Sequence, residues 1–83
     1  MIHLKFDEQE RKILETLNQE GAMSPSRVSA VSWVMPHETM LLLETLNKEG
    51  MVLMREDTHS PDGKVVAITR QARHLLQEMN KQS

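Results

Sequence analysis

The sequence contains no cysteine, so neither a disulfide nor a thiolate metal site can brace the fold. It also lacks long apolar runs. The longest, such as Met40–Leu43, are four residues, far short of the about 20 that span a bilayer. The first residues, Met1–Lys5, are followed by Asp7 and Glu8 before any apolar stretch, which argues against a signal peptide. These absences predict a soluble, cytoplasmic protein with no membrane partner.

Positive charge is scarce as well. The chain has 10 Lys and Arg against 12 Asp and Glu, a net charge of -2. Between Ile13 and Asn47, Arg27 is the only Lys or Arg. Nucleic-acid-binding domains usually carry a basic surplus. The composition therefore argues against strong charge-driven binding to nucleic acid.

Residue patterns of catalysis are missing too. No nucleophile–base pair, paired catalytic carboxylates or glycine-rich phosphate loop is visible, and so short a chain has little room for a pocket. His37 and Glu38 could open a zinc-protease motif, but Leu41 stands where its second histidine belongs. Asp57, His59 and Asp62 share one loop without a fourth strong ligand. We therefore expect no enzyme, no cofactor and no metal site, and interpret that loop as a solvated tip.

The 83 residues, 39% of them apolar, suffice for one small domain, 1–83, with one core. Such a small domain buries only about 60% of its unfolded surface, so its stability margin is thin. The first predicted helix begins at Asp7, where Glu10 completes a capping box, and ends at Gly21. Its apolar stripe is Ile13, Leu14 and Leu17.

Two more helices are predicted. One begins at Ser24–Pro25 and ends near Ser32 or Trp33, and the other runs from about Met35–Pro36 to Gly50. Segments 13–21 and 42–50 both end in Leu-x-x-x-Gly, which predicts a left-handed cap after each helix. The side chains expected to face inward are Val28, Val31, Thr39, Leu42, Leu43 and Leu46.

Beyond Gly50 the apolar period changes to that of strands. Segments 51–56 and 64–69 read as a hairpin around the turn Ser60–Gly63. Thr69 then caps a last helix from Arg70 to about Asn80, with Ala72, Leu75, Leu76 and Met79 on one side. Met23, Met51 and Met79 are expected to fill the core. The predicted class is α+β, mainly α: a winged helix-turn-helix with a three-helix core, a two-stranded β-wing and a short C-terminal helix.

Three segments carry a family resemblance over residues 10 to 79. Gly50-Met51-Val52 stands where MarR-type transcriptional regulators have Gly-Leu-Val. The turn 60–64 looks like the wing tip of that family, and 68–76 is similar to its Leu-Thr-x-x-Gly-Arg-x-Leu-Leu. The chain thus resembles a MarR-type winged helix. The resemblance implies a DNA-binding transcription regulator, with a recognition helix at about 36–48 in the major groove and a wing at 55–64 on the backbone or minor groove.

The resemblance also implies the residues that contact double-stranded DNA. They come from the start of the second helix, from the recognition helix and from the wing: Ser24, Ser26, Arg27, His37, Thr39, Met40, Leu41, Arg55, His59 and Lys64. Arg70 and Arg73 of the last helix either hold phosphates as well or form a solvated face.

The chain departs from the family in its recognition helix, which is poor in Arg and Lys and carries Glu38 and Glu44. Trp33 replaces the glycine that usually makes the turn before this helix. Met40 and Leu41 lie away from the expected core unless the helix is rotated. An alternative therefore stays open, in which Trp33, Met40 and Leu41 bind a protein partner and DNA binding is weak or absent.

The family dimerises through helices that flank this domain. Only six residues precede Asp7, and the last helix is about three turns long. We therefore expect a homodimer, if one forms, to use a different surface.

Overall fold

The protein was analysed as a computed structural model, which describes residues 6–81. The segment Met1–Lys5, used above to argue against a signal peptide, lies outside the described residues. Along the chain the elements are α1 (Glu8–Glu20), α2 (Pro25–Ser32), α3 (Pro36–Lys48), β1 (Val52–Glu56), β2 (Lys64–Ile68) and α4 (Arg70–Lys81). This order confirms the predicted winged helix, with each boundary within about two residues of its expected place.

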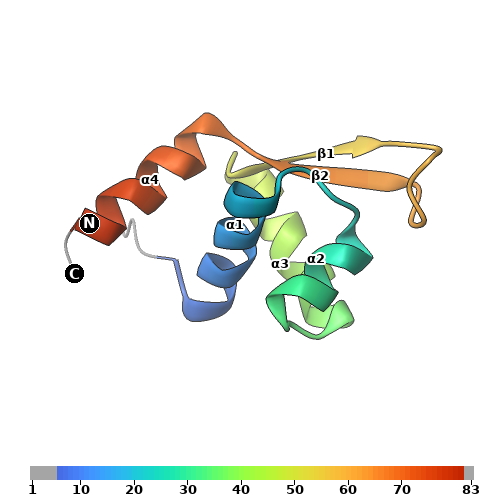
Figure 1. The fold of residues 1–83 in the computed structure, drawn as a ribbon, viewed down its shortest axis with the longest axis horizontal. Helices are drawn as coiled ribbons and strands as arrows, with labels where there is room; N and C mark the ends of the chain where they lie inside the picture. Colours follow the sequence, from blue (N-terminus) through green and yellow to red (C-terminus); the bar gives the residue numbers. More distant parts are fainter. Residues whose placement is uncertain (1–5, 82–83) are drawn as a thin grey trace.

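The two strands form an antiparallel hairpin, called the wing below, that lies over the bundle of α1, α2 and α3 (Figure 1). Its tip projects at one end of the molecule, and α4 lies at the other end (Figure 1). Val52 pairs with Ile68 and Glu56 with Lys64. The loop before α2 joins this sheet at one point, because Met23 and Val66 exchange backbone hydrogen bonds of 3.0 and 2.8 Å.

One apolar core holds these elements together. Its members come from all four helices, both strands and the loops between them: Ile13, Leu14, Leu17, Met23, Val28, Val34, Leu43, Leu46, Met51, Val52, Val66, Ile68, Ala72 and Leu76. Leu42 and Leu75 pack against this core while partly exposed. Val31 was predicted to face inward and Met79 to fill the core, but the side chains of both residues are only half-buried.

The capping box predicted at the start of α1 is present. Glu10 N–H donates to Asp7 Oδ1 at 2.8 Å, and Asp7 N–H donates to Glu10 Oε1 at 3.1 Å. Burial raises the pKa of the Glu10 carboxyl, although the hydrogen bond from the Asp7 backbone acts in the opposite direction. The box therefore fixes where α1 begins.

The ends of α1 and α3 differ despite their shared sequence. After α3, Gly50 N–H donates to Asn47 O at 3.1 Å and Met51 N–H donates to Leu46 O at 2.8 Å, which is a Schellman cap. This cap requires the positive φ of Gly50, 77°. Gly21 has φ 93° but ψ -173°, so it ends α1 in an extended conformation. The prediction of a left-handed cap was wrong there, because the chain must turn at once toward the β-bridge at Met23.

None of the helices described over residues 6–81 has the length and apolar character needed to cross a membrane.

Candidate nucleic-acid interface

Two buried hydroxyl groups set the turn between α2 and α3. Ser29 Oγ donates to Val34 O at 2.5 Å, and Thr39 Oγ1 donates to the same oxygen at 3.2 Å. Trp33 ends α2 with φ 63° and ψ 31°, a left-handed conformation that residues with a Cβ seldom adopt. The two hydroxyls bond the same carbonyl from α2 and from α3, and so hold the two helices together as a helix-turn-helix.

Two of the predicted DNA contacts are used inside the domain instead. Thr39 is 1% exposed and bonded to Val34, as described above. Ser24 is 9% exposed, and its Oγ accepts a hydrogen bond of 3.3 Å from Arg27 N–H as the cap of α2. Their hydroxyls are therefore not free to meet a ligand, and we leave both residues out of the candidate interface.

The tip of the wing is fastened to the start of α2. Asp62 Oδ2 accepts a hydrogen bond of 2.6 Å from Ser26 N–H. Within the tip, Asp57 N–H donates to Gly63 O at 2.9 Å and Ser60 Oγ donates to Lys64 O at 2.6 Å. The wing thus has a defined place beside the helix-turn-helix. The carboxylate of Asp62 occupies a helix N-terminus, where negative charge is favoured.

Three adjoining hollows join α2, α3 and the wing into one surface. The first, of about 570 Å³, lies between α2 and the wing and includes Ser26 and Arg27. The second, of about 240 Å³, lies between the starts of α2 and α3 and shares Ser26 with the first. The third, of about 250 Å³, lies between α3 and the wing and shares Met40 with the second. Together they form what we call the α3–wing surface.

Most of the remaining predicted contacts lie on this surface or beside it. Arg27, Arg55 and Lys64 line its first and third hollows and are exposed. Met40 is half-buried, whereas Leu41 is 51% exposed, which confirms that α3 turns apolar side chains away from the core. His37 and His59 are exposed at the start of α3 and at the wing tip. Within the described residues, neither Arg27 nor the two wing cations are in an ion pair.

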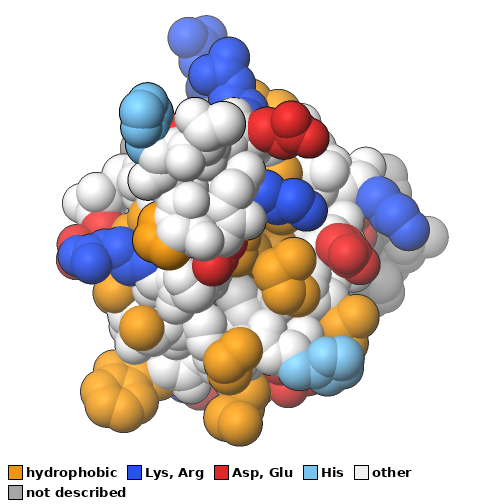
Figure 2. Space-filling model, turned by 90° about the vertical axis from the view of Figure 1, so that its right-hand side faces the viewer, with side chains coloured by type: hydrophobic (Ala, Val, Ile, Leu, Met, Phe, Trp, Pro, Cys, Tyr) orange, Lys and Arg blue, Asp and Glu red, His pale blue; other side chains and the backbone are white. Residues whose placement is uncertain are grey.

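Negative charge accompanies these cations. Glu44 and Glu56 line the same hollow as Arg55 and Lys64. Figure 2 looks onto the end of the molecule that carries the wing tip. Lys and Arg side chains gather in the upper half of that view, and hydrophobic side chains dominate the lower half. The surface is therefore mixed in charge, with an apolar side, rather than a continuous basic patch.

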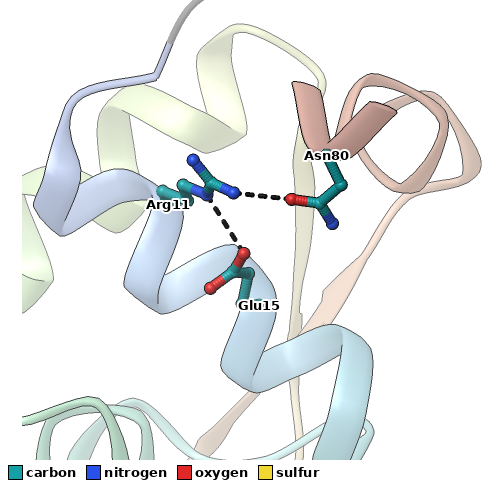
Figure 3. A network of polar contacts seen from close by, with 3 residues as sticks. All are labelled: Arg11, Glu15 and Asn80. Atoms are coloured by element: carbon teal, nitrogen blue, oxygen red, sulfur yellow. Dashed lines mark hydrogen bonds and ion pairs between the residues drawn. The ribbon is translucent and has the colours of Figure 1, made fainter. Parts of the chain in front are cut away.

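The opposite end of the molecule is built by α4 against α1. Arg11 of α1 donates from Nε to Glu15 Oε2 at 3.0 Å and from Nη2 to Asn80 Oδ1 at 2.5 Å (Figure 3). Arg70 and Arg73 are exposed on α4. Neither arginine lines any of the three hollows that define the α3–wing surface, and α4 as a whole lies at the end away from the wing tip (Figure 1).

Comparison with solved structures identifies the architecture. BpsR of Bordetella bronchiseptica, whose DNA binding is regulated by 6-hydroxynicotinic acid, superposes with a TM-score of 0.85 over 98% of this chain at 20% identity. A mutant of MarR from E. coli in complex with operator DNA gives 0.83 over 94% at 17% identity. The transcriptional regulator Tm0710 from Thermotoga maritima gives 0.78 over 89% at 19% identity.

This chain has the MarR-type winged-helix fold. At these identities the likeness is one of fold, and the chain spans 61%, 56% and 52% of the lengths of BpsR, the MarR mutant and Tm0710. No family model matches the sequence, and no curated protein matches it. The resemblance noted in the sequence is thus confirmed by the three-dimensional arrangement of the MarR-type elements.

Sequence reasoning missed the role of Asp62 and assigned it only to a solvated tip. The turn signal Ser60–Gly63 placed it correctly in the hairpin, but its partner Ser26 lies 36 residues away. Within the described residues, no three His, Cys, Asp or Glu side chains are grouped so that they could hold a metal ion.

Proposed function

We propose that the chain is a DNA-binding module of a transcription regulator, with α3 in the major groove and the wing on the backbone or minor groove. The observation that carries this proposal is the convergence of the start of α2, the start of α3 and the wing on one surface with three unpaired cations. In helix-turn-helix proteins the early residues of the recognition helix meet base edges, while flanking cations hold phosphates.

The roles follow from the positions of the side chains. We assign Arg27, Arg55 and Lys64 to contacts with DNA phosphates. We assign Ser26 and His37, in the first turns of α2 and α3, to polar contacts with the DNA. His59 at the wing tip is assigned to the sugar–phosphate backbone. Because Glu44 and Glu56 lie beside the wing cations, we expect affinity for random DNA to be modest.

The test is a fluorescence-anisotropy titration of the protein on random duplex DNA at several salt concentrations. If each of the three cations neutralises one phosphate, log Kobs falls with log[salt] with a slope of about -2.7 per chain. Arg27→Ala and Lys64→Ala should each reduce this slope by about 0.9. Arg73→Ala is the matched control, because it removes an exposed arginine at the other end of the molecule.

A lack of binding at low salt, or equal slopes for Arg27→Ala and the wild type, contradicts the proposal. In the first case the alternative function gains support, in which the apolar side chains of Trp33, Met40 and Leu41 bind a protein. This alternative is motivated by the side chain of Trp33, which is 90% exposed next to Met35 at 72%.

If two copies of the chain bind adjacent half-sites about 34–36 Å apart, the measured stoichiometry should be two chains per DNA site.

A further inference from the structure

An apolar notch lies beside the first turn of α3, the part of the helix that we propose meets base edges. It is the second hollow described above, of about 240 Å³, and it is lined by Pro25, Ser26, Pro36, Met40 and Asp62. Pro25 and Pro36 are the first residues of α2 and α3, so the notch opens at the point where the two helix starts converge. Met40 lies one turn beyond Pro36 and forms part of the same face.

The exposed residues around this notch cannot make the usual hydrogen-bonded contacts with purines. Bidentate recognition of guanine uses Arg or Lys, and recognition of adenine uses Asn or Gln. None of these four residue types occurs in the first eleven residues of α3, PHETMLLLETL. The first Asn and Lys, Asn47 and Lys48, are in the last turn. Apart from the polar contact assigned to His37, the part of α3 that enters a groove first thus offers Met40 and Leu41 for apolar contact.

Only one base presents an apolar group in the major groove, and that group is the C5-methyl of thymine. We propose that the notch between α2 and α3 recognises thymine through this methyl group, with Met40 as its wall and Leu41 as a second contact on the adjoining base pair. The proposal rests on the DNA-binding function proposed above and specifies which base edge is read. Three of the five residues that line the notch, Pro25, Pro36 and Met40, are apolar.

The sharpest test compares two duplexes that differ only in this methyl group. The probes are alternating poly(dA-dT) and alternating poly(dA-dU), which present the same hydrogen-bonding groups. Affinities are measured by competition against a fluorescent random duplex at fixed salt. Burying one methyl group corresponds to a factor of about four in affinity. We therefore expect the thymine duplex to bind at least about fourfold more tightly for each methyl group in contact.

Variants test whether a preference for thymine comes from the notch or from the effect of the methyl group on the shape of the duplex. Met40 is half-buried and Leu41 is exposed. Met40→Ala and Leu41→Ala should bring the ratio of the affinities for the thymine and uracil duplexes closer to one. Leu53→Ala is the matched control, because Leu53 is 56% exposed on β1 and does not line the notch. Circular dichroism confirms that each variant is folded. Arg27→Ala should weaken binding to both duplexes equally.

The outcomes are distinct. A preference for thymine that Met40→Ala removes and Leu53→Ala keeps supports the inference. Equal, salt-dependent affinity for both duplexes overturns the inference but leaves the DNA-binding function intact. A preference that survives in both the Met40→Ala and Leu41→Ala variants also overturns it, because the notch is then not its source. Absence of binding to every duplex at low salt overturns the function and the inference together.

Discussion

Replacing Trp33 by glycine should make the domain more stable. Trp33 is the only non-glycine residue in the described part of the chain with a positive φ, 63°. A left-handed conformation costs a residue with a Cβ about 1–2 kcal/mol. Glycine avoids this cost but loses about 0.5–1 kcal/mol more backbone entropy on folding. Because the indole is 90% exposed, little burial is lost, and the net gain in the free energy of unfolding is about 0.75 kcal/mol at the midpoints of these two ranges, within limits of about 0 and 1.5 kcal/mol.

Trp33→Ala is the control that isolates the backbone. Alanine removes the indole but keeps the Cβ, so its left-handed strain stays and its stability should be close to that of the wild type. Since about 1 kcal/mol shifts the melting temperature of a domain of this size by about 4–8 °C, the glycine variant should melt about 2–8 °C higher.

Urea unfolding followed by far-ultraviolet circular dichroism is the suitable assay. Trp33 is the only tryptophan, and it is already solvent-exposed when folded, so its fluorescence should change little on unfolding. If the glycine variant is no more stable than the alanine variant, the reasoning about backbone strain is wrong. If both variants lose more than about 1 kcal/mol, the indole contributes packing that its exposure does not suggest.

Three further predictions concern other parts of the domain. Asp62→Asn, whose amide oxygen can still accept the hydrogen bond from Ser26 N–H, should bind random DNA more tightly, because it removes a negative charge from the α3–wing surface and keeps the anchor of the wing tip; unchanged or weaker binding in the anisotropy titration contradicts this. Leu43→Ala, which empties part of the core, should lower the free energy of unfolding by about 2–5 kcal/mol; a urea midpoint close to that of the wild type would show that neighbouring side chains fill the space. The raised pKa of Glu10 means that the folded state binds a proton more tightly than the unfolded state. The stability of the wild type relative to Glu10→Gln should therefore increase as the pH falls from 7 toward 4. If the urea midpoints of the two proteins differ by the same amount at both pH values, this prediction is wrong.

The elements of the fold could be predicted because their signals are local. The capping box at Asp7, the prolines at the starts of α2 and α3, and the turn at Ser60–Gly63 each act within a few residues. Their boundaries were accordingly correct to within about two residues. The helical period also showed that Leu41 does not face the core, and it is exposed.

The site was harder to predict because it depends on contacts between distant segments. Thr39 was predicted to face inward from its helical spacing and to contact DNA from the family resemblance; the inward position is confirmed, because its hydroxyl is buried and donates to Val34 O. Asp62 was expected in solvent, but the folded wing brings it to Ser26. The family resemblance predicted which segments contribute to the surface, whereas the partners of individual hydroxyls and carboxylates required three-dimensional coordinates.

The β-bridge between Met23 and Val66 restricts how the wing and the helix-turn-helix can move relative to each other. It anchors the loop that leads into α2 directly to the strand that carries the wing, and Asp62 adds a second anchor at the wing tip. The wing and the helix-turn-helix are therefore expected to dock as one preorganised body, with little loss of conformational entropy on binding. Association should then be limited by the orientation of the two molecules during encounter rather than by rearrangement of the wing.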